Sequence, residues 1–213
     1  MTSKLKHCSA WRSSIACLLL LATGVCCAAD APAATSAPAA AQSLCDLLLK
    51  VMKQGSTLDF AGRVKLLDAP LRQLYDMPLV TRLVVGPPWR SMSPQDQQAV
   101  LAAFSDYSTA VYASRFKSYS GEKFVVDPAT SQAASGDTIV HTKLYPHGGE
   151  AVELDYLERQ EADGWHIIDV LLSGTISEMA ERRSEYSSAV RDGGAAALIH
   201  LLHDKTAQLA AQP

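Results

Sequence analysis

The residues best suited to acid–base chemistry are a histidine and two aspartates in the second half of the chain. His166 and Asp169 are three positions apart in a strand-like run, so their side chains point to opposite faces and cannot form a dyad. Asp155 and Asp169 fall on neighbouring expected strands, where two carboxylates could share a proton. We favour a structural role, in which each accepts hydrogen bonds from arginine or backbone donors on the polar face of the sheet.

Two histidines are the best metal-ligand pair in the sequence. His200 and His203 are spaced i, i+3 on an expected helix, but the sequence places no third ligand beside them. Neither a glycine-rich phosphate loop nor a G-x-S-x-G nucleophile elbow occurs. We therefore predict a protein that is not an enzyme and that uses no metal or other cofactor.

The first 29 residues have the pattern of an export signal. Three basic residues precede an apolar run over residues 14–22, and small residues follow up to Ala28 and Ala29. The run is too short to cross a membrane. Cleavage after Ala28 or Ala29 predicts an exported, soluble chain. Acylation of Cys26 or Cys27 is the alternative, which the bulky Val25 before Cys26 disfavours.

Removing this signal changes both the charge and the cysteine count. Without Lys4, Lys6 and Arg12, the 19 basic residues fall to 16 against 22 acidic ones, so the net charge of −3 becomes −6. An acidic chain without a basic cluster argues against nucleic acid as a partner. Cys45 is the one cysteine beyond the signal, which excludes an internal disulfide and predicts a small buried side chain rather than a reactive thiol.

The remaining chain divides into a linker and one domain. Residues 30–42 contain only alanine, proline, serine, threonine and a few polar residues, a composition that predicts a flexible tether. Residues 43–213 suit a single domain. Its first expected helices cover residues 43–54 and 58–67, and a third segment is opened by Pro70 and interrupted by Pro78. A long helix is expected at 93–119 with Ser93 as N-cap. The last two helices are expected from Thr175 and, after a break at Gly193 and Gly194, at 195–210.

Between these helices the period changes to the alternation of β-strands. Four strands are expected at 122–127, 137–145, 150–160 and 164–173, with hairpin turns that make them antiparallel. One face is apolar and contains Val140, Thr142, Leu144, Val152, Leu154, Tyr156, Ile168, Val170 and Leu172. The prediction is an α+β domain whose four-stranded antiparallel sheet has one apolar face covered by several helices, mainly the Ser93 helix and its neighbours. An ordinary dry core is the alternative to a hydrophobic pocket at this face.

From about Thr57 to Lys205, the order of several short motifs resembles the periplasmic phospholipid-carrier family of MlaC and the toluene-tolerance proteins. The most telling piece is the run from Tyr75 to Gly86, followed by Trp89-Arg90 and the Ser93-Pro94 helix start. The other pieces are 112–121, 152–156, 164–170 and 193–202. The run Gly174-Thr175-Ile176-Ser177-Glu178 departs from the family pattern at the rim of the expected pocket and is similar to the hopanoid-associated branch, HpnM.

The resemblance implies a periplasmic carrier that encloses acyl chains and leaves the head group near solvent. It implies transfer between an inner-membrane lipid transporter with a lipid-binding ring and an outer-membrane lipoprotein complex. Its pocket would be lined by Val152, Leu154, Tyr156 and Ile168 on the sheet, with Leu83, Val84, Phe104 and Val111 opposite; the alternation adds Leu144 and Val170. Hopanoid is the rival cargo, and a cargo-free periplasmic interaction module is the rival function. Arg82, Arg90 and Arg115 are the residues that could bind a head-group phosphate.

Overall fold

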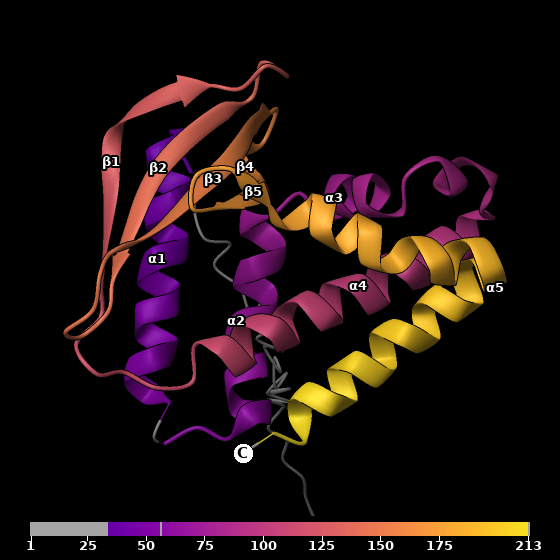
Figure 1. Cartoon of the computed structure of the whole chain (residues 1–213), viewed down its shortest axis with the longest axis horizontal. Coiled ribbons are helices and arrows are strands. Elements are labelled where there is room, and N and C mark those ends of the chain that lie inside the picture. The colour runs from indigo at the N-terminus through magenta and orange to yellow at the C-terminus, as the bar shows by residue number, and fades with distance from the viewer. Residues whose placement is uncertain (1–33, 56, 213) are drawn as a thin grey trace, which may run out of the picture. The chain divides into compact units, whose positions relative to one another are not determined.

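The computed structural model describes residues 34–55 and 57–212, which fold around a single antiparallel sheet (Figure 1). The predicted signal, 1–29, and the first four residues of the predicted linker lie outside the described residues. The elements are α1 (Ala37–Gln54), α2 (Phe60–Leu74), α3 (Met77–Val85), the 3-10 helix η1 (Pro87–Ser91), α4 (Pro94–Arg115), β1 (Lys123–Gln132), β2 (Thr138–Tyr145), β3 (Val152–Glu161), β4 (Gly164–Leu172), β5 (Ile176–Ser177) and α5 (Glu178–Ala210). No helix within these residues is long and apolar enough to cross a membrane.

The sheet confirms the predicted fold class, with one strand more than expected. Its strands are antiparallel and ordered β1-β2-β3-β4-β5, so each pairs with its neighbour in sequence. Val140 faces Tyr156 across the β2–β3 pair, and Tyr156 faces Val170 across the β3–β4 pair. These three side chains are therefore on one face, as the alternation predicts, and all three are buried. The short β5 leads the chain directly into α5.

Helix α1 begins six residues earlier than the sequence indicates, so the linker assigned to 30–42 is wrong for residues 37–42. The Ser36 hydroxyl accepts a hydrogen bond from the Ala39 backbone N–H, and a proline in the first turn favours initiation there. Ala37, Ala40 and Ala41 are buried. Residues 37–42 contain no large apolar side chain, but their alanines allow the helix to approach the sheet closely.

Helix α1 also takes the covering role that was assigned to the Ser93 helix. It packs against β1, β2, β3 and β4, whereas α4 packs on α2, α3 and α5 (Figure 1). The reason is the stripe of fully buried side chains on α1, which includes Leu44, Leu48 and Val51. Cys45 belongs to the same buried face, and burial raises the pKa of its thiol to about 12. This confirms the prediction of a buried cysteine.

Helix breaks were expected at Pro70, Pro78 and the Gly193-Gly194 pair, and two of the three occur. Pro70 does not open a new helix but lies inside α2, where the complete burial of Leu67 and Leu71 offsets the lost backbone hydrogen bond. Pro78 restarts the chain as α3, which ends at Gly86. The break at the Gly193-Gly194 pair is confirmed, because Gly194 has φ 62° within α5 and divides it into two helical segments.

Two helix boundaries differ from the predicted ones. Ser93 caps α4 as expected, but the helix ends at Arg115 instead of continuing to residue 119. Arg63 of α2 donates to the Ala113 and Leu58 backbone oxygens, which satisfies a carbonyl in the last turn of α4. The N-cap of α5 is Ser177 instead of Thr175, because residues 176 and 177 extend the sheet first.

One buried carboxyl on the apolar side of the sheet breaks the expected pattern. Glu158 of β3 is completely buried, and its carboxyl oxygens have no hydrogen-bond partner among the described residues. Burial raises the pKa of Glu158 to about 8, and the backbone at Ala41 of α1 partly offsets this effect. The group is therefore neutral in the folded chain at neutral pH.

The buried Glu158 makes stability pH-dependent. Its folded-state pKa of about 8 exceeds the ordinary value of 4.5, so the folded chain keeps a proton that the unfolded chain releases within that range. The free energy of unfolding should fall as pH rises from 4.5 to about 8 and then level off. Glu158→Gln should abolish this slope and be more stable above that range by on the order of several kcal/mol, as measured by urea unfolding at a series of pH values. Glu161→Gln, at an exposed position of the same strand, should keep the wild-type slope; a wild-type slope in Glu158→Gln would contradict the assignment.

Candidate functional site

A small cavity lies where α3, α4, β4 and the start of α5 meet. Its volume is about 40 Å³. Its lining is mainly apolar on three sides, with polar groups at the α5 side, and comprises Tyr75, Met77, Val80, Phe104, Ser108, Tyr112, Ile168, Asp169, Val170, Glu178, Met179 and Arg182. A cavity of this size holds a few water molecules but not an acyl chain.

The ten residues predicted to contact lipid are distributed over three environments. Phe104, Ile168 and Val170 line the cavity. Val84, Val111 and Tyr156 are buried in the surrounding core. Leu144 and Leu154 are half-buried, whereas Leu83 and Val152 are 37% and 44% exposed. The structure thus brings three of the ten together at one cavity, and the lipid contacts of all ten remain predictions.

Leu144, Val152 and Leu154 continue the apolar face of the sheet beyond the cavity. Leu144 pairs with Phe124 and with Val152, and Leu172 pairs with Leu154 and with the exposed Ile176. All of these side chains share the face of Val170. The sheet therefore has a fully covered apolar end and a partly exposed apolar end.

Aromatic side chains join this open end to the cavity. Phe116 stacks on Tyr112 with ring centroids 5.8 Å apart and contacts Phe124 of β1 at 6.4 Å. Tyr112 in turn packs against Tyr75, and their hydroxyl groups are hydrogen-bonded. Burial raises the pKa of both hydroxyls, so this bond joins two neutral groups. The row of rings gives a continuous apolar path from the edge of the sheet to the cavity.

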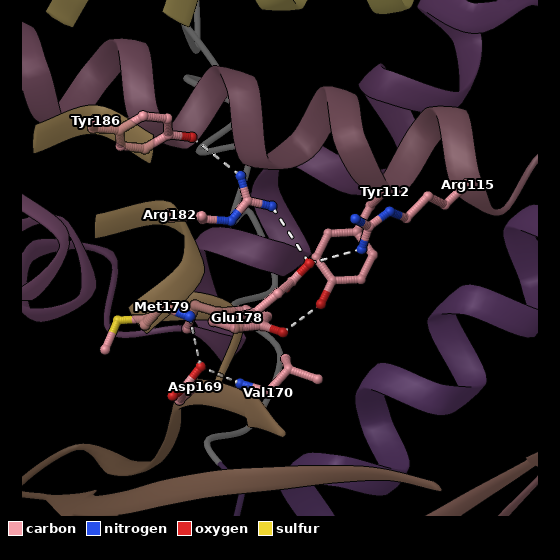
Figure 2. Close-up of polar contacts among 9 residues, drawn as sticks. Tyr112, Arg115, Asp169, Val170, Glu178, Met179, Arg182 and Tyr186 are labelled. Carbon is pink, nitrogen blue, oxygen red and sulfur yellow. Dashed lines mark hydrogen bonds and ion pairs between the residues drawn. The ribbon is translucent and has the colours of Figure 1, made fainter. Parts of the chain in front are cut away.

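Polar side chains close the α5 side of the cavity. The Glu178 carboxylate lies between the guanidinium groups of Arg115 and Arg182, as Figure 2 shows. Arg115 Nη1 donates to Glu178 Oε1 at 2.7 Å, and Arg182 Nη2 lies 3.6 Å from the same oxygen. Because Arg115 ends α4 and Glu178 begins α5, this contact ties the two helices together across the cavity.

Arg182 is the more enclosed of the two arginines at the site. Its side chain is only 13% exposed. Its Nη1 donates to the Tyr186 hydroxyl at 3.2 Å, and its guanidinium lies 5.2 Å from the centroid of the Tyr107 ring. These two contacts fix the position of the guanidinium independently of Glu178.

Asp169 attaches the start of α5 to the sheet. Its Oδ1 accepts hydrogen bonds from the backbone N–H groups of Val170 at 2.7 Å and Met179 at 3.1 Å (Figure 2). Its Oδ2 accepts one from the Ser177 hydroxyl. Burial raises the pKa of Asp169, and the hydrogen bonds from Ser177 and the backbone partly offset this effect. These contacts agree with the predicted structural role, in which Asp169 accepts hydrogen bonds from backbone donors.

The other chemistry-bearing residues belong to separate networks. His166 contacts Asp163 and the Gln73 carbonyl oxygen instead of Asp169, and His200 pairs with Asp204 on the surface. Among the described residues, no group of three or more histidine, cysteine or acidic side chains is placed to hold a metal ion. Asp155 and Asp169 have no partner in common in their hydrogen bonds.

Asp155 belongs to a contact network that the sequence did not indicate. Its Oδ2 is 2.9 Å from His141 Nδ1, and His141 Nε2 is 2.9 Å from the Ser131 hydroxyl. His141 lies opposite the point where the β1–β2 register shifts between Val126 and Thr130. Asp155 Oδ1 also accepts from the Thr142 backbone N–H, so the network joins β1, β2 and β3 beside a β-bulge.

Two of the three arginines predicted to bind a phosphate lie away from the cavity. Arg82 and Arg90 are exposed and do not line the cavity, whereas Arg115 contacts its rim through Glu178. Arg182 was missed. The i, i+4 spacing of Glu178 and Arg182 was the available signal, because it predicts an ion pair on a helix.

Together, the fold and the site define an α+β domain with an apolar cavity that is closed by ion pairs. A family model described as MlaC protein matches residues 42–204. This match covers most of the chain, so the chain belongs to the MlaC family. The family resemblance read from the motifs is confirmed, while the hopanoid-associated branch stays a prediction.

A solved structure shares this fold. It is a phospholipid-binding protein from Ralstonia solanacearum in complex with a phospholipid, with a TM-score of 0.71 and 22% sequence identity. The match covers 83% of this chain and 99% of that chain. At this identity the likeness establishes a common fold, which confirms the predicted α+β architecture.

Removing the Asp169 carboxylate should release the start of α5. Asp169→Ala eliminates three hydrogen bonds, so we expect the free energy of unfolding to fall by about 2–3 kcal/mol, as measured by urea unfolding. Hydrogen exchange at the Met179 amide should accelerate. Asp163→Ala removes an aspartate whose side chain is 78% exposed and should change stability much less. Equal losses in the two variants would show that Asp169 is not an anchor.

Proposed function

We propose that this chain is a periplasmic lipid-binding carrier that moves phospholipid between inner- and outer-membrane complexes. Membership of the MlaC family is the observation that carries the proposal. The phospholipid bound to the Ralstonia protein of the same fold supports it. The basic and apolar pattern of residues 1–29 supports export to the periplasm.

The proposed path for the acyl chains runs along the apolar face of the sheet. Leu144, Val152 and Leu154 form its accessible end, and Phe104 and Ile168 its inner end at the cavity. The aromatic row from Phe124 to Tyr75 lies beside this path. Each methylene transferred there from water would gain roughly 0.8 kcal/mol.

Loading requires the cavity to enlarge, because 40 Å³ cannot admit a chain. The first segment of α5 is the element suited to move. Before it, Ser173 and Gly174 have φ values of 52° and 71°, and after it Gly194 has φ 62°. The segment lies between two backbone irregularities, and polar contacts hold its first turn, while Tyr186 and Val190 further along are buried in the core. We propose that membrane-complex partners open the site by displacing this segment, which couples docking to lipid transfer.

The small cavity favours one second candidate, a cargo-free periplasmic interaction module. In that case the apolar face would stay packed and the exposed end of the sheet would contact a protein partner. The two candidates differ in a measurable quantity, the amount of lipid that leaves the cell with the protein.

Lipid extraction tests the choice between them. Protein expressed with its signal and purified from the periplasm should yield phospholipid at close to one molecule per chain, identified by mass spectrometry of the extract. A triterpenoid in the extract would show that the cargo is not phospholipid, but the carrier function would stand. Protein that carries no lipid, and that takes up none from phospholipid vesicles, would favour the interaction module.

Filling the inner end of the path should prevent loading. Ile168→Trp places a larger side chain at the cavity and should reduce co-purified lipid severalfold, at an overpacking cost of about 1–3 kcal/mol. Val80→Phe is a smaller change at the same cavity, for use if the first variant unfolds. Val125→Trp, at a 53% exposed position on the opposite face, should load normally. A full lipid load in folded Ile168→Trp or Val80→Phe would contradict the proposed path.

A further inference from the structure

We propose that Arg115 and Arg182 form the binding site for the phosphate of a phospholipid head group, and that the Glu178 carboxylate occupies this site in the empty protein. The inference rests on the proposed function, because it assigns the head-group end of the same cavity. It goes beyond that function by naming the residues that distinguish a phospholipid from an uncharged lipid.

The position of the two arginines is the first argument. Arg182 lines the apolar cavity and also a neighbouring hollow of about 300 Å³, which Arg115, Tyr107 and Glu178 line as well. The pair therefore lies where an apolar space meets an open polar one. A lipid with its chains in the first space would place its phosphate in the second.

The rigidity of Arg182 is the second argument. Tyr186 and Tyr107 hold its guanidinium from other directions, so it stays in place when Glu178 leaves. Leaving it without an anion would be costly, because the side chain is only 13% exposed. A phosphodiester supplies one negative charge and two acceptor oxygens, as the displaced carboxylate does.

The bridging position of Glu178 is the third argument. It is the first residue of α5 and lies between Ser177 and Met179, which Asp169 holds to the sheet. Its carboxylate bridges α4 and α5, so phosphate binding to the arginines would remove the contact that closes the cavity. Head-group binding and opening would then favour each other, because one anion replaces the other.

The remaining charges around the hollow define the head group further. Glu181 and Glu185 also line it, and Glu185 pairs with Lys205 of the same helix. Glu181 therefore adds a carboxylate beside the two arginines, to which the displaced Glu178 would add a second. A zwitterionic head group with an amine beyond its phosphate complements this arrangement better than a purely anionic one.

Lipids that differ only in the head group test the site. The probe is displacement of the neutral dye N-phenylnaphthylamine from delipidated full-length mature protein, by dioleoyl phosphatidylethanolamine or by dioleoylglycerol. We expect the wild type to prefer the phospholipid. Arg115→Gln should reduce this preference about tenfold, the effect of losing one charge-assisted hydrogen bond.

Further variants separate the head-group site from general effects. Arg182→Gln should reduce the preference at least as much, and Arg182→Lys keeps the charge if that variant fails to fold. Glu178→Gln should increase phospholipid binding, because it removes the competing carboxylate. Arg191→Gln removes an equal charge from an exposed position of α5 and should behave as wild type.

Two results would overturn the inference in distinguishable ways. If the wild type binds both lipids but Arg115→Gln and the Arg182 variants keep its preference, the head-group site is wrong while the carrier function stands. If neither lipid displaces the dye, or the wild type binds no dye, the proposed function fails and the head-group site fails with it.

Discussion

The apolar face of the sheet must be shielded from water, and the rest of the fold depends on how this is done. Helix α1 covers one end with a stripe of fully buried leucines and alanines, which is an ordinary packed core. The other end is covered only in part, by the aromatic row and by the start of α5. The apolar face is therefore fully packed at one end, while apolar side chains such as Val152 and Ile176 are exposed at the other end.

The contacts that hold α5 in place are of a different kind from those that hold α1. Glu178 joins Arg115 through a contact in which the arginine is 58% exposed, and such ion pairs contribute little to stability. Asp169 supplies the stronger attachment through three hydrogen bonds at the base of the helix. The first turn of α5 is therefore held by polar contacts, whereas Tyr186 and Val190 further along the helix pack in the hydrophobic core.

The sequence predicted the elements well where a single local rule decides them. Alternation identified β1 to β4, and Ser93 and Gly194 marked a helix start and a helix break. Predictions were wrong where tertiary packing overrides the local rule, as at the alanines of α1 and at Pro70. The site was harder to predict, because Phe104 of α4 and Ile168 and Val170 of β4 come together at one cavity only in the folded chain. The contacts of Arg182 with Tyr107 and Tyr186 likewise depend on how α5 packs on α4.

The small cavity also follows from this division of contacts. An empty space large enough for an acyl chain would expose its apolar lining to water or leave it without packing partners, and either state is costly. A closed site in which Tyr75 and Tyr112 bond to each other avoids that cost at the inner end. At the outer end Glu178 gives Arg182 a partner, so a poorly solvated guanidinium is not left unpaired. In the closed form the apolar side chains are packed and the Arg182 guanidinium has an anionic partner. A lipid can replace both kinds of contact only if it supplies acyl chains and an anion together.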